Sequence, residues 1–327
     1  MLSPHRSALS KINRSDQTGP LKILTLPTHE GYAENLSKTG HEFHMIQGPG
    51  IKTWDHHTRK LPHNHFIYLI DNNQFRGETQ FDLFLAQERH AGYGIGKQIK
   101  ERYNIPLIMI DHTEPPPNKK IAKILSEYRA DAHVFITAHN QSTWGHTDAT
   151  STVIPHGINT DVFAGYEGIV PRGISCVNQF ATRDVFCGWN LWNQIKQTVP
   201  LDLIGDNPGL SDSINQSDKL AAKLASYRFF LNTSQLSPCP LSLLEAMAVG
   251  LPVVSTAKQE IPNIITHGVN GFLSNEPEEL VKYCNLLIAD PVLARTMGAA
   301  ARQTILDRFS ISSFVQSWNK VFYSAIN

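Results

Sequence analysis

The stretch Ser234–Thr256 (SQLSPCPLSLLEAMAVGLPVVST) contains a single acidic residue, Glu245, among apolar and small residues. A helix is predicted to begin at Pro240, because a proline at the first helical position gives up no hydrogen bond, and Gly250 is expected to end it. On the same face, the predicted neighbours of Glu245 are Leu241, Ser242, Ala248 and Val249. Burying a carboxylate there costs free energy unless a partner compensates it. Glu245 is therefore either a paired, functional carboxylate or a glutamate that faces solvent at the helix edge.

Two further candidates follow predicted strands. The apolar run Pro106–Ile110 leads directly into Asp111 and His112, and ligands in open α/β sheets collect beyond the carboxyl ends of the strands. His112 is therefore a candidate active-site residue, with an ordinary loop histidine as the alternative. Gly31 lies in the loop after the run Leu21–Leu26, as in the first turn of a Rossmann-like unit. A single glycine does not define a phosphate site by itself.

Length and composition restrict the class of protein. The 327 residues exceed the size at which one hydrophobic core usually suffices, so two domains are expected. Lys plus Arg and Asp plus Glu balance at 29 each, which gives no indication of a general polyanion-binding surface. The four cysteines form no CxxC pair, which favours reduced thiols in the cytosol over a disulfide framework or a zinc site. The histidines near His56 and His63 lack the spacing of a metal motif, so no metal site is expected.

No apolar run is long enough to span a bilayer, and the N-terminus lacks the hydrophobic segment of a signal peptide. A soluble, cytoplasmic protein is therefore expected. Residues 1–20 are polar and mildly basic. A flexible tail is predicted there, with an organelle-targeting segment as the alternative.

Predicted strands and helices alternate along both halves of the chain. In the first half the strands are Leu21–Leu26, Glu42–Gln47, Phe66–Ile70, Phe81–Ala86, Pro106–Ile110 and His133–Ala138, and the longer helices are Gly94–Tyr103 and Lys119–Arg129. In the second half the strands are Ile174–Val177, Leu201–Ile204, Phe229–Asn232, Leu251–Ser255 and Phe272–Leu273. Helices are predicted there at Trp189–Gln197, Lys219–Ser226, Pro277–Ile288, Pro291–Arg308 and Ile311–Phe322, and a loop at Asn178–Gly188. This alternation favours mainly parallel sheets covered by helices on both faces.

Several segments together resemble the retaining GT-B glycosyltransferases, in particular glycosyltransferase family 4. They are VIPHGINTDVF (Val153–Phe163), SLLEAMAVGLPVVST with EIPNIITHGVNGFL (Ser242–Leu273), IPLIMIDHT (Ile105–Thr113) and LDLIGDN (Leu201–Asn207). The resemblance extends from about residue 105 to the C-terminus. It is weak over the first hundred residues, where this family usually binds its acceptor.

The resemblance implies an α/β protein of the GT-B fold, with two Rossmann-like domains that face each other across a cleft. The acceptor domain would comprise residues 21–155, completed by a C-terminal helix at residues 311–327. The donor domain would comprise residues 156–310. The implied activity is that of a hexosyltransferase-like enzyme, which moves a sugar from a nucleotide diphosphate sugar with retention of anomeric configuration. It needs no metal and no cofactor besides the nucleotide sugar as co-substrate.

The resemblance also implies roles for single residues. Glu245 would hydrogen-bond donor hydroxyls, above all those of the ribose. His112 would lie beside the reacting sugar, and Gly31 would let the first domain approach the diphosphate. The N–H groups that bind the diphosphate at the helix start would be those of Leu241, Ser242 and Leu243.

Two positions depart from the family's pattern. Eight positions before Glu245, where the family usually carries an acid, this chain has Ser237, and prolines replace the flanking glycines. Ser237 can still hydrogen-bond the donor sugar, but it carries no charge. Of the family's arginine–lysine pair, expected between Asn178 and Gly188, only Arg183 is present. Arg183 is assigned to the diphosphate, with a solvated loop arginine as the alternative.

Three functions are compatible with these features. The first is a retaining glycosyltransferase, whose acceptor is a glycan, a lipid-linked sugar, a protein or a modified nucleic-acid base. The second is a GT-B-fold epimerase acting on the nucleotide sugar itself, against which Ser237 argues because such enzymes need extra acid/base carboxylates. The third is a non-catalytic nucleotide-sugar-binding protein or partner subunit, for which the missing acid and lysine are the evidence.

Overall fold

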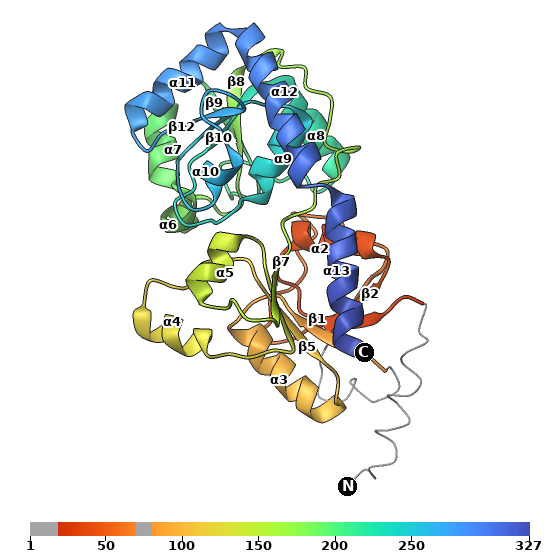
Figure 1. The fold of residues 1–327 in the computed structure, drawn as a ribbon. Helices are drawn as coiled ribbons and strands as arrows, with labels where there is room; N and C mark the ends of the chain where they lie inside the picture. Colours follow the sequence, from red (N-terminus) through yellow and green to blue (C-terminus); the bar gives the residue numbers. More distant parts are fainter. Residues whose placement is uncertain (1–18, 70–79) are drawn as a thin grey trace, which may run out of the picture.

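The computed structural model describes residues 19–69 and 80–327. These form two α/β units, which follow one another along the chain (Figure 1). Every strand pairing in both sheets is parallel. Residues 1–18 of the predicted tail, and Ile70 of the predicted strand Phe66–Ile70, lie outside the described residues. Within the described ranges, none of the helices is both long and apolar enough to cross a membrane.

The first unit is built on a seven-stranded sheet in the order β3-β2-β1-β4-β5-β6-β7. Its strands are β1 (Lys22–Thr25), β2 (Glu42–Gln47), β3 (His65–Leu69), β4 (Leu83–Ala86), β5 (Leu107–Asp111), β6 (Ala132–Phe135) and β7 (Ser151–Val153). Its helices are α2 (Glu30–Leu36), η1 (Ser37–Thr39), α3 (Ala91–Tyr103), α4 (Lys119–Ser126) and α5 (Ala138–Trp144). The direction of chain progression reverses between β1 and β4, which is where ligands bind in such sheets.

The second unit is built on a five-stranded sheet in the order β12-β11-β10-β8-β9. Its strands are β8 (Val170–Cys176), β9 (Leu201–Ile204), β10 (Tyr227–Asn232), β11 (Val253–Ser255) and β12 (Gly271–Leu273). Its helices are η2 (Ala181–Arg183), α6 (Asp184–Cys187), α7 (Trp189–Lys196), α8 (Ser217–Ser226), α9 (Leu241–Val249), α10 (Ile261–Ile264), α11 (Pro277–Ala289) and α12 (Pro291–Arg308). Here the reversal falls between β8 and β10.

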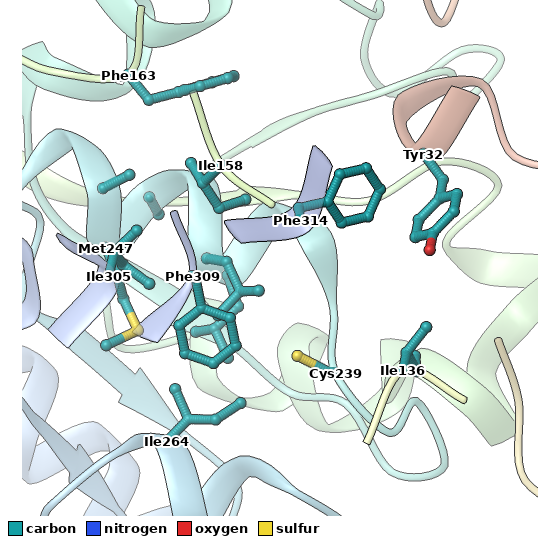
Figure 2. Packing of buried hydrophobic residues seen from close by; sticks show 14 of the residues in the cluster. Tyr32, Ile136, Ile158, Phe163, Cys239, Met247, Ile264, Ile305, Phe309 and Phe314 are labelled. Carbon is teal, nitrogen blue, oxygen red and sulfur yellow. The ribbon is translucent and has the colours of Figure 1, made fainter. Parts of the chain in front are cut away.

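The last helix, α13 (Ile311–Ile326), leaves the second unit and packs on the first (Figure 1). Its buried face carries Phe314, Trp318 and Phe322, and the Trp318 indole Nε1–H donates to the Tyr32 hydroxyl at 2.9 Å. The rings of Phe314 and Tyr32 meet edge to face with centroids 5.4 Å apart (Figure 2). Gly157 in the connecting segment permits this packing, because a Cβ there would lie 2.5 Å from that of Phe314. An apolar core therefore ties the two units together behind the cleft.

Three local predictions were wrong. The predicted loop Asn178–Gly188 contains η2 and α6. The predicted strand His133–Ala138 ends at Phe135, because the Thr137 side chain accepts a hydrogen bond from the Asn140 N–H and starts α5, a helix that the pattern did not predict. Pro240 lies one residue before α9, because its ψ of 124° is extended.

Candidate functional site: a cavity between the two sheets

A cavity lies between the carboxyl ends of the two sheets. His29 and Gly31 after β1 line it from the first unit, and Cys176 at the end of β8 and Asn232 at the end of β10 line it from the second. It thus lies at the reversal point of each sheet, where doubly wound folds bind their ligands. The predicted residues that line this cavity are Gly31, Arg183, Ser237, Leu241, Ser242 and Glu245.

The start of α9 supplies unpartnered backbone donors to the cavity. Within the described residues, neither the Leu241 N–H nor the Ser242 N–H makes a hydrogen bond, and both residues line the cavity. The prediction that the Leu243 N–H is also free was wrong. It donates to the Pro240 carbonyl at 3.1 Å, because the first turn is tight. Two free donors and the positive end of the helix dipole make this an anion-binding position.

Glu245 is buried in the helix, which excludes the alternative that it faces solvent, and its partner is a residue that the sequence did not indicate. Its Oε1 accepts a hydrogen bond from the Arg59 Nη2 at 2.8 Å, and both side chains are less than 10% exposed. Burial raises the pKa of the Glu245 carboxyl above its ordinary value, and the positive charge of Arg59 offsets part of that rise. Within the described residues, Glu245 Oε2 accepts no hydrogen bond, so it is free to accept one from a ligand.

Arg59 belongs to the segment 55–60 between β2 and β3, which crosses the cleft. Thr58 Oγ1 accepts a hydrogen bond from the Asn178 Nδ2 at 3.2 Å. The Lys60 N–H donates to the Asn215 carbonyl at 3.1 Å. The Asn215 side-chain Nδ2 in turn donates to the His56 carbonyl at 2.9 Å. The segment 55–60 therefore closes one side of the cavity and places Arg59 inside it.

Two glycines bring backbone close to the cavity. A Cβ on Gly31 would lie 2.8 Å from the Leu241 Cδ2, so the starts of α2 and α9 abut across the cleft. Gly205 has a φ of +124°, and a Cβ there would lie 2.2 Å from the Val177 carbonyl oxygen, so no other residue fits. The turn after β9 therefore packs directly against the end of β8, and both line the cavity.

Arg183 and Ser237 complete the lining on the second unit. Arg183 is exposed at the end of η2, where its Nη1 donates to the Asn178 carbonyl at 3.4 Å. Ser237 is half-buried in the segment before α9. The structure brings both to the cavity that contains Glu245, while their roles stay predictions.

His112 follows β5 and does not line the cavity directly. Its ring stacks on that of His29, with centroids 5.4 Å apart, and meets Tyr32 edge to face at 4.5 Å. Its two ring nitrogens are buried without a hydrogen-bond partner in the described part of the chain, and burial lowers its pKa well below the ordinary value. The ring is therefore neutral at pH 7 and has both nitrogens unused. Among the described residues, no group of three or more His, Cys, Asp or Glu side chains is arranged to hold a metal ion.

Comparisons with known proteins agree with this arrangement. Residues 185–304 match the family described as glycosyl transferases group 1. The chain is 30% identical over 115 residues to N-acetyl-alpha-D-glucosaminyl L-malate synthase of Bacillus anthracis, covering 35% of this chain and 30% of that protein. It is 35% identical over 101 residues to the sulfoquinovosyl transferase SQD2 of Arabidopsis thaliana, covering 29% and 20%. The chain thus spans less than a third of the length of these curated relatives.

Solved structures match over nearly the whole chain. Anabaena HepE in complex with UDP and glucose gives a TM-score of 0.73 at 16% identity, covering 93% of this chain and all of that one. Sucrose-phosphate synthase from Thermosynechococcus elongatus gives 0.70 at 14% identity, covering 94% and 98%.

The fold is that of the GT-B glycosyltransferases, in which two α/β units, each built on a parallel sheet, lie on either side of a cavity. Within this fold, the segment 185–304 that matches the glycosyl transferases group 1 family contains α9 and Glu245. The GT-B prediction is confirmed, while membership of family 4 stays a prediction.

Proposed function

We propose that the protein transfers a sugar from a nucleotide diphosphate sugar to an acceptor. The observation that carries this proposal is the shared cavity, which is lined by the free N–H groups at the start of α9, by Arg183 and by Glu245. Backbone N–H groups and an arginine suit a diphosphate, and a carboxylate suits ribose hydroxyls. Further support comes from HepE, whose structures were solved with UDP and with UDP-glucose.

The finer mechanism belongs to the same proposal. Transfer proceeds without a metal and with retention of anomeric configuration. The start of α9 and Arg183 stabilise the charge that develops on the leaving diphosphate. The leaving phosphate accepts the proton of the acceptor, and His112 orients the reacting sugar. The acceptor classes to be tested are a glycan, a lipid-linked sugar, a protein and a modified nucleic-acid base, and the cytosolic location stays a prediction from the cysteine pattern.

Nucleotide-sugar binding without turnover is a second candidate function. Ser237 stands where an acid was expected, and one oxygen of Glu245 is already occupied by Arg59. Both features favour a binding protein or partner subunit that uses the same cavity.

Incubation with a panel of nucleotide sugars separates the two candidates. For the transferase, we expect one donor to release its nucleoside diphosphate, and nuclear magnetic resonance of the product to show the anomeric configuration of the donor. Binding without release supports the second candidate. No binding of any donor contradicts both, and inverted product contradicts the retaining mechanism.

Arg183→Ala tests where the diphosphate lies. We expect donor affinity to fall at least about tenfold, since a charged hydrogen-bonding partner is lost. Titration calorimetry with the donor measures this. Lys219→Ala is the matched control, because Lys219 is an exposed base of the same unit that does not line the cavity. Equal affinities in the two variants would show that Arg183 does not bind the diphosphate.

A further inference from the structure

A second cation reaches the candidate donor site from the opposite unit. Arg59 and Arg183 both line the cavity, one from the segment 55–60 and one from η2. We propose that Arg59 is a direct ligand of the donor diphosphate, which it binds together with Arg183. This inference rests on the proposed function, since it assigns one more residue to the same donor.

The guanidinium of Arg59 lies beside the start of α9. A Cβ built on Gly31 would be 4.0 Å from the Arg59 Nε and Nη2 and 2.8 Å from the Leu241 Cδ2. Gly31 thus separates the guanidinium from the helix turn whose free N–H groups face the cavity. A diphosphate bound to those N–H groups lies within reach of Arg59.

Arg59 keeps donors available for such a ligand. A guanidinium carries five N–H donors, and two of them are used, by the Thr58 carbonyl at 3.2 Å and by Glu245 at 2.8 Å. The Nε is buried and forms an ion pair with a Glu34 carboxylate oxygen at 3.1 Å, so the donors left for a ligand are one N–H on Nη1 and one on Nη2. Arg59 can therefore bind a phosphate oxygen while it still holds Glu245.

The local charges make a cation at this position necessary. Glu34 and Glu245 are both paired with Arg59. Without Arg59, the buried carboxylate of Glu245, which lines the cavity, would face an incoming diphosphate unpaired, and like charges repel strongly at a buried position. Arg59 removes this repulsion and contributes N–H groups of its own.

The backbone of Arg59 is held in place before any ligand binds. The Trp54 indole Nε1–H donates to the Arg59 carbonyl at 3.0 Å, and Thr58 and Lys60 on either side bond to the second unit. Such preorganisation means that little ordering is needed when the diphosphate arrives. Because the cation comes from the first unit, diphosphate binding also favours the closed cleft.

The test measures how much the second phosphate group contributes to affinity. Calorimetry with UDP, ADP, GDP and dTDP first identifies the base, and the nucleoside monophosphate of that base is then compared with its diphosphate. The dissociation constant of the monophosphate divided by that of the diphosphate measures what the terminal phosphate contributes to binding. A purely structural role for Arg59 would weaken both ligands equally and leave this ratio unchanged.

The Arg59 substitution is made in the Glu245→Gln variant. The unpaired carboxylate of Glu245 then cannot repel the diphosphate, so a change in the ratio reports the lost contact of Arg59. We expect Arg59→Met/Glu245→Gln to show a ratio at least about tenfold smaller than Glu245→Gln alone. Arg59→Lys is expected to keep part of the ratio. Lys60→Met is the matched control, because it removes the same charge from the next, exposed residue, and it should keep the wild-type ratio.

Two outcomes would overturn the inference in distinguishable ways. Equal ratios in Glu245→Gln and in the double variant would show that Arg59 does not bind the terminal phosphate of the diphosphate, which would overturn the inference while the donor site stands. Absence of nucleotide binding by the wild-type protein would overturn the proposed function, and this inference with it.

Discussion

The pair of Glu245 and Arg59 holds two charges in a place where each alone would be strongly disfavoured. Their side chains are 7% and 9% exposed, and removing one partner of such a buried pair typically costs about 3–5 kcal/mol. The pair also joins α9 to the segment 55–60 of the other unit. A substitution of either residue therefore changes both the site and the contact between the units. Activity loss in a single variant does not by itself assign a role to Glu245.

His112→Ala tests the place of His112 beside the reacting sugar. The ring nitrogens have no hydrogen-bond partner among the described residues, and the proposed function assigns them a hydroxyl of the reacting sugar. We expect kcat to fall by about tenfold or more while donor affinity changes less than about threefold. Steady-state kinetics and donor titration measure the two quantities. The opposite pattern, with weak donor binding and normal kcat, would place His112 at the donor and not at the reacting centre.

The site residues that the sequence predicted all lie in or beside a sequence segment that could be recognised by its motif or by its strand and helix pattern. Leu241, Ser242 and Glu245 are fixed relative to one another by the helix itself. Arg59 could not be found this way, because its segment has no motif and its partner lies 186 positions away. The requirement that a buried carboxylate needs a base was visible in the sequence, but the base itself was not.

At the scale of elements, α2 and α9 meet through a glycine, and Gly31→Val tests that contact. A Cβ at Gly31 would lie 2.8 Å from the Leu241 Cδ2, so a valine is expected to separate the two helices. We expect donor affinity to fall at least about tenfold and small-angle X-ray scattering to show a more open cleft.

The contact offers both a rescue and a control. Gly31→Val/Leu241→Ala removes the clashing methyl group and should recover part of the affinity. Gly94→Val should leave affinity unchanged, because nothing lies within 4 Å of a Cβ at Gly94. A Gly31→Val variant with normal affinity, or a double variant no better than the single one, would contradict the role of this contact.

The alternating pattern predicted most elements, since many of the strands are short apolar runs that alternate with helical segments. Strand β2 and helix α12, for example, have the bounds that the sequence predicted. The errors arose where a local hydrogen bond decides the structure. Thr137 starts α5 by capping it, and Gly188 in the left-handed region, with a φ of +76°, ends α6. Such caps depend on one side chain or one backbone angle and leave no periodic trace.

At the scale of the whole molecule, the two units are joined differently on the two sides. Apolar contacts of α13 with Tyr32 tie them together behind the cleft, whereas polar contacts of the segment 55–60 join them at the cavity. Polar contacts exchange readily with water, while the apolar core does not. Opening of the cleft is therefore expected to break the contacts of the segment 55–60 first, with α13 as the side that stays closed.

The stability of the whole molecule should fall as the pH decreases from 7 to 5. Burial lowers the pKa of His65, His133 and His156 from 6.5 to about 3. Below pH 6.5 the unfolded chain binds protons that the folded one does not, so each histidine removes roughly 1.4 kcal/mol of stability per pH unit. Burial raises the pKa of Asp111 from 3.8 to about 6 and also raises the pKa of Glu245, which acts in the opposite direction, but two carboxyls do not offset three imidazoles.

Urea unfolding followed by tryptophan fluorescence at pH 7 and pH 5 measures this loss, which is expected to be on the order of a few kcal/mol. His156→Gln should make the pH dependence shallower by about one proton, since His156 is buried and its Nδ1 has no partner among the described residues. His139→Gln, at an exposed position of α5, should leave the pH dependence unchanged. Stability that is constant or rises towards pH 5, or an identical slope in all three proteins, would show that the buried histidines do not control the acid sensitivity of this fold.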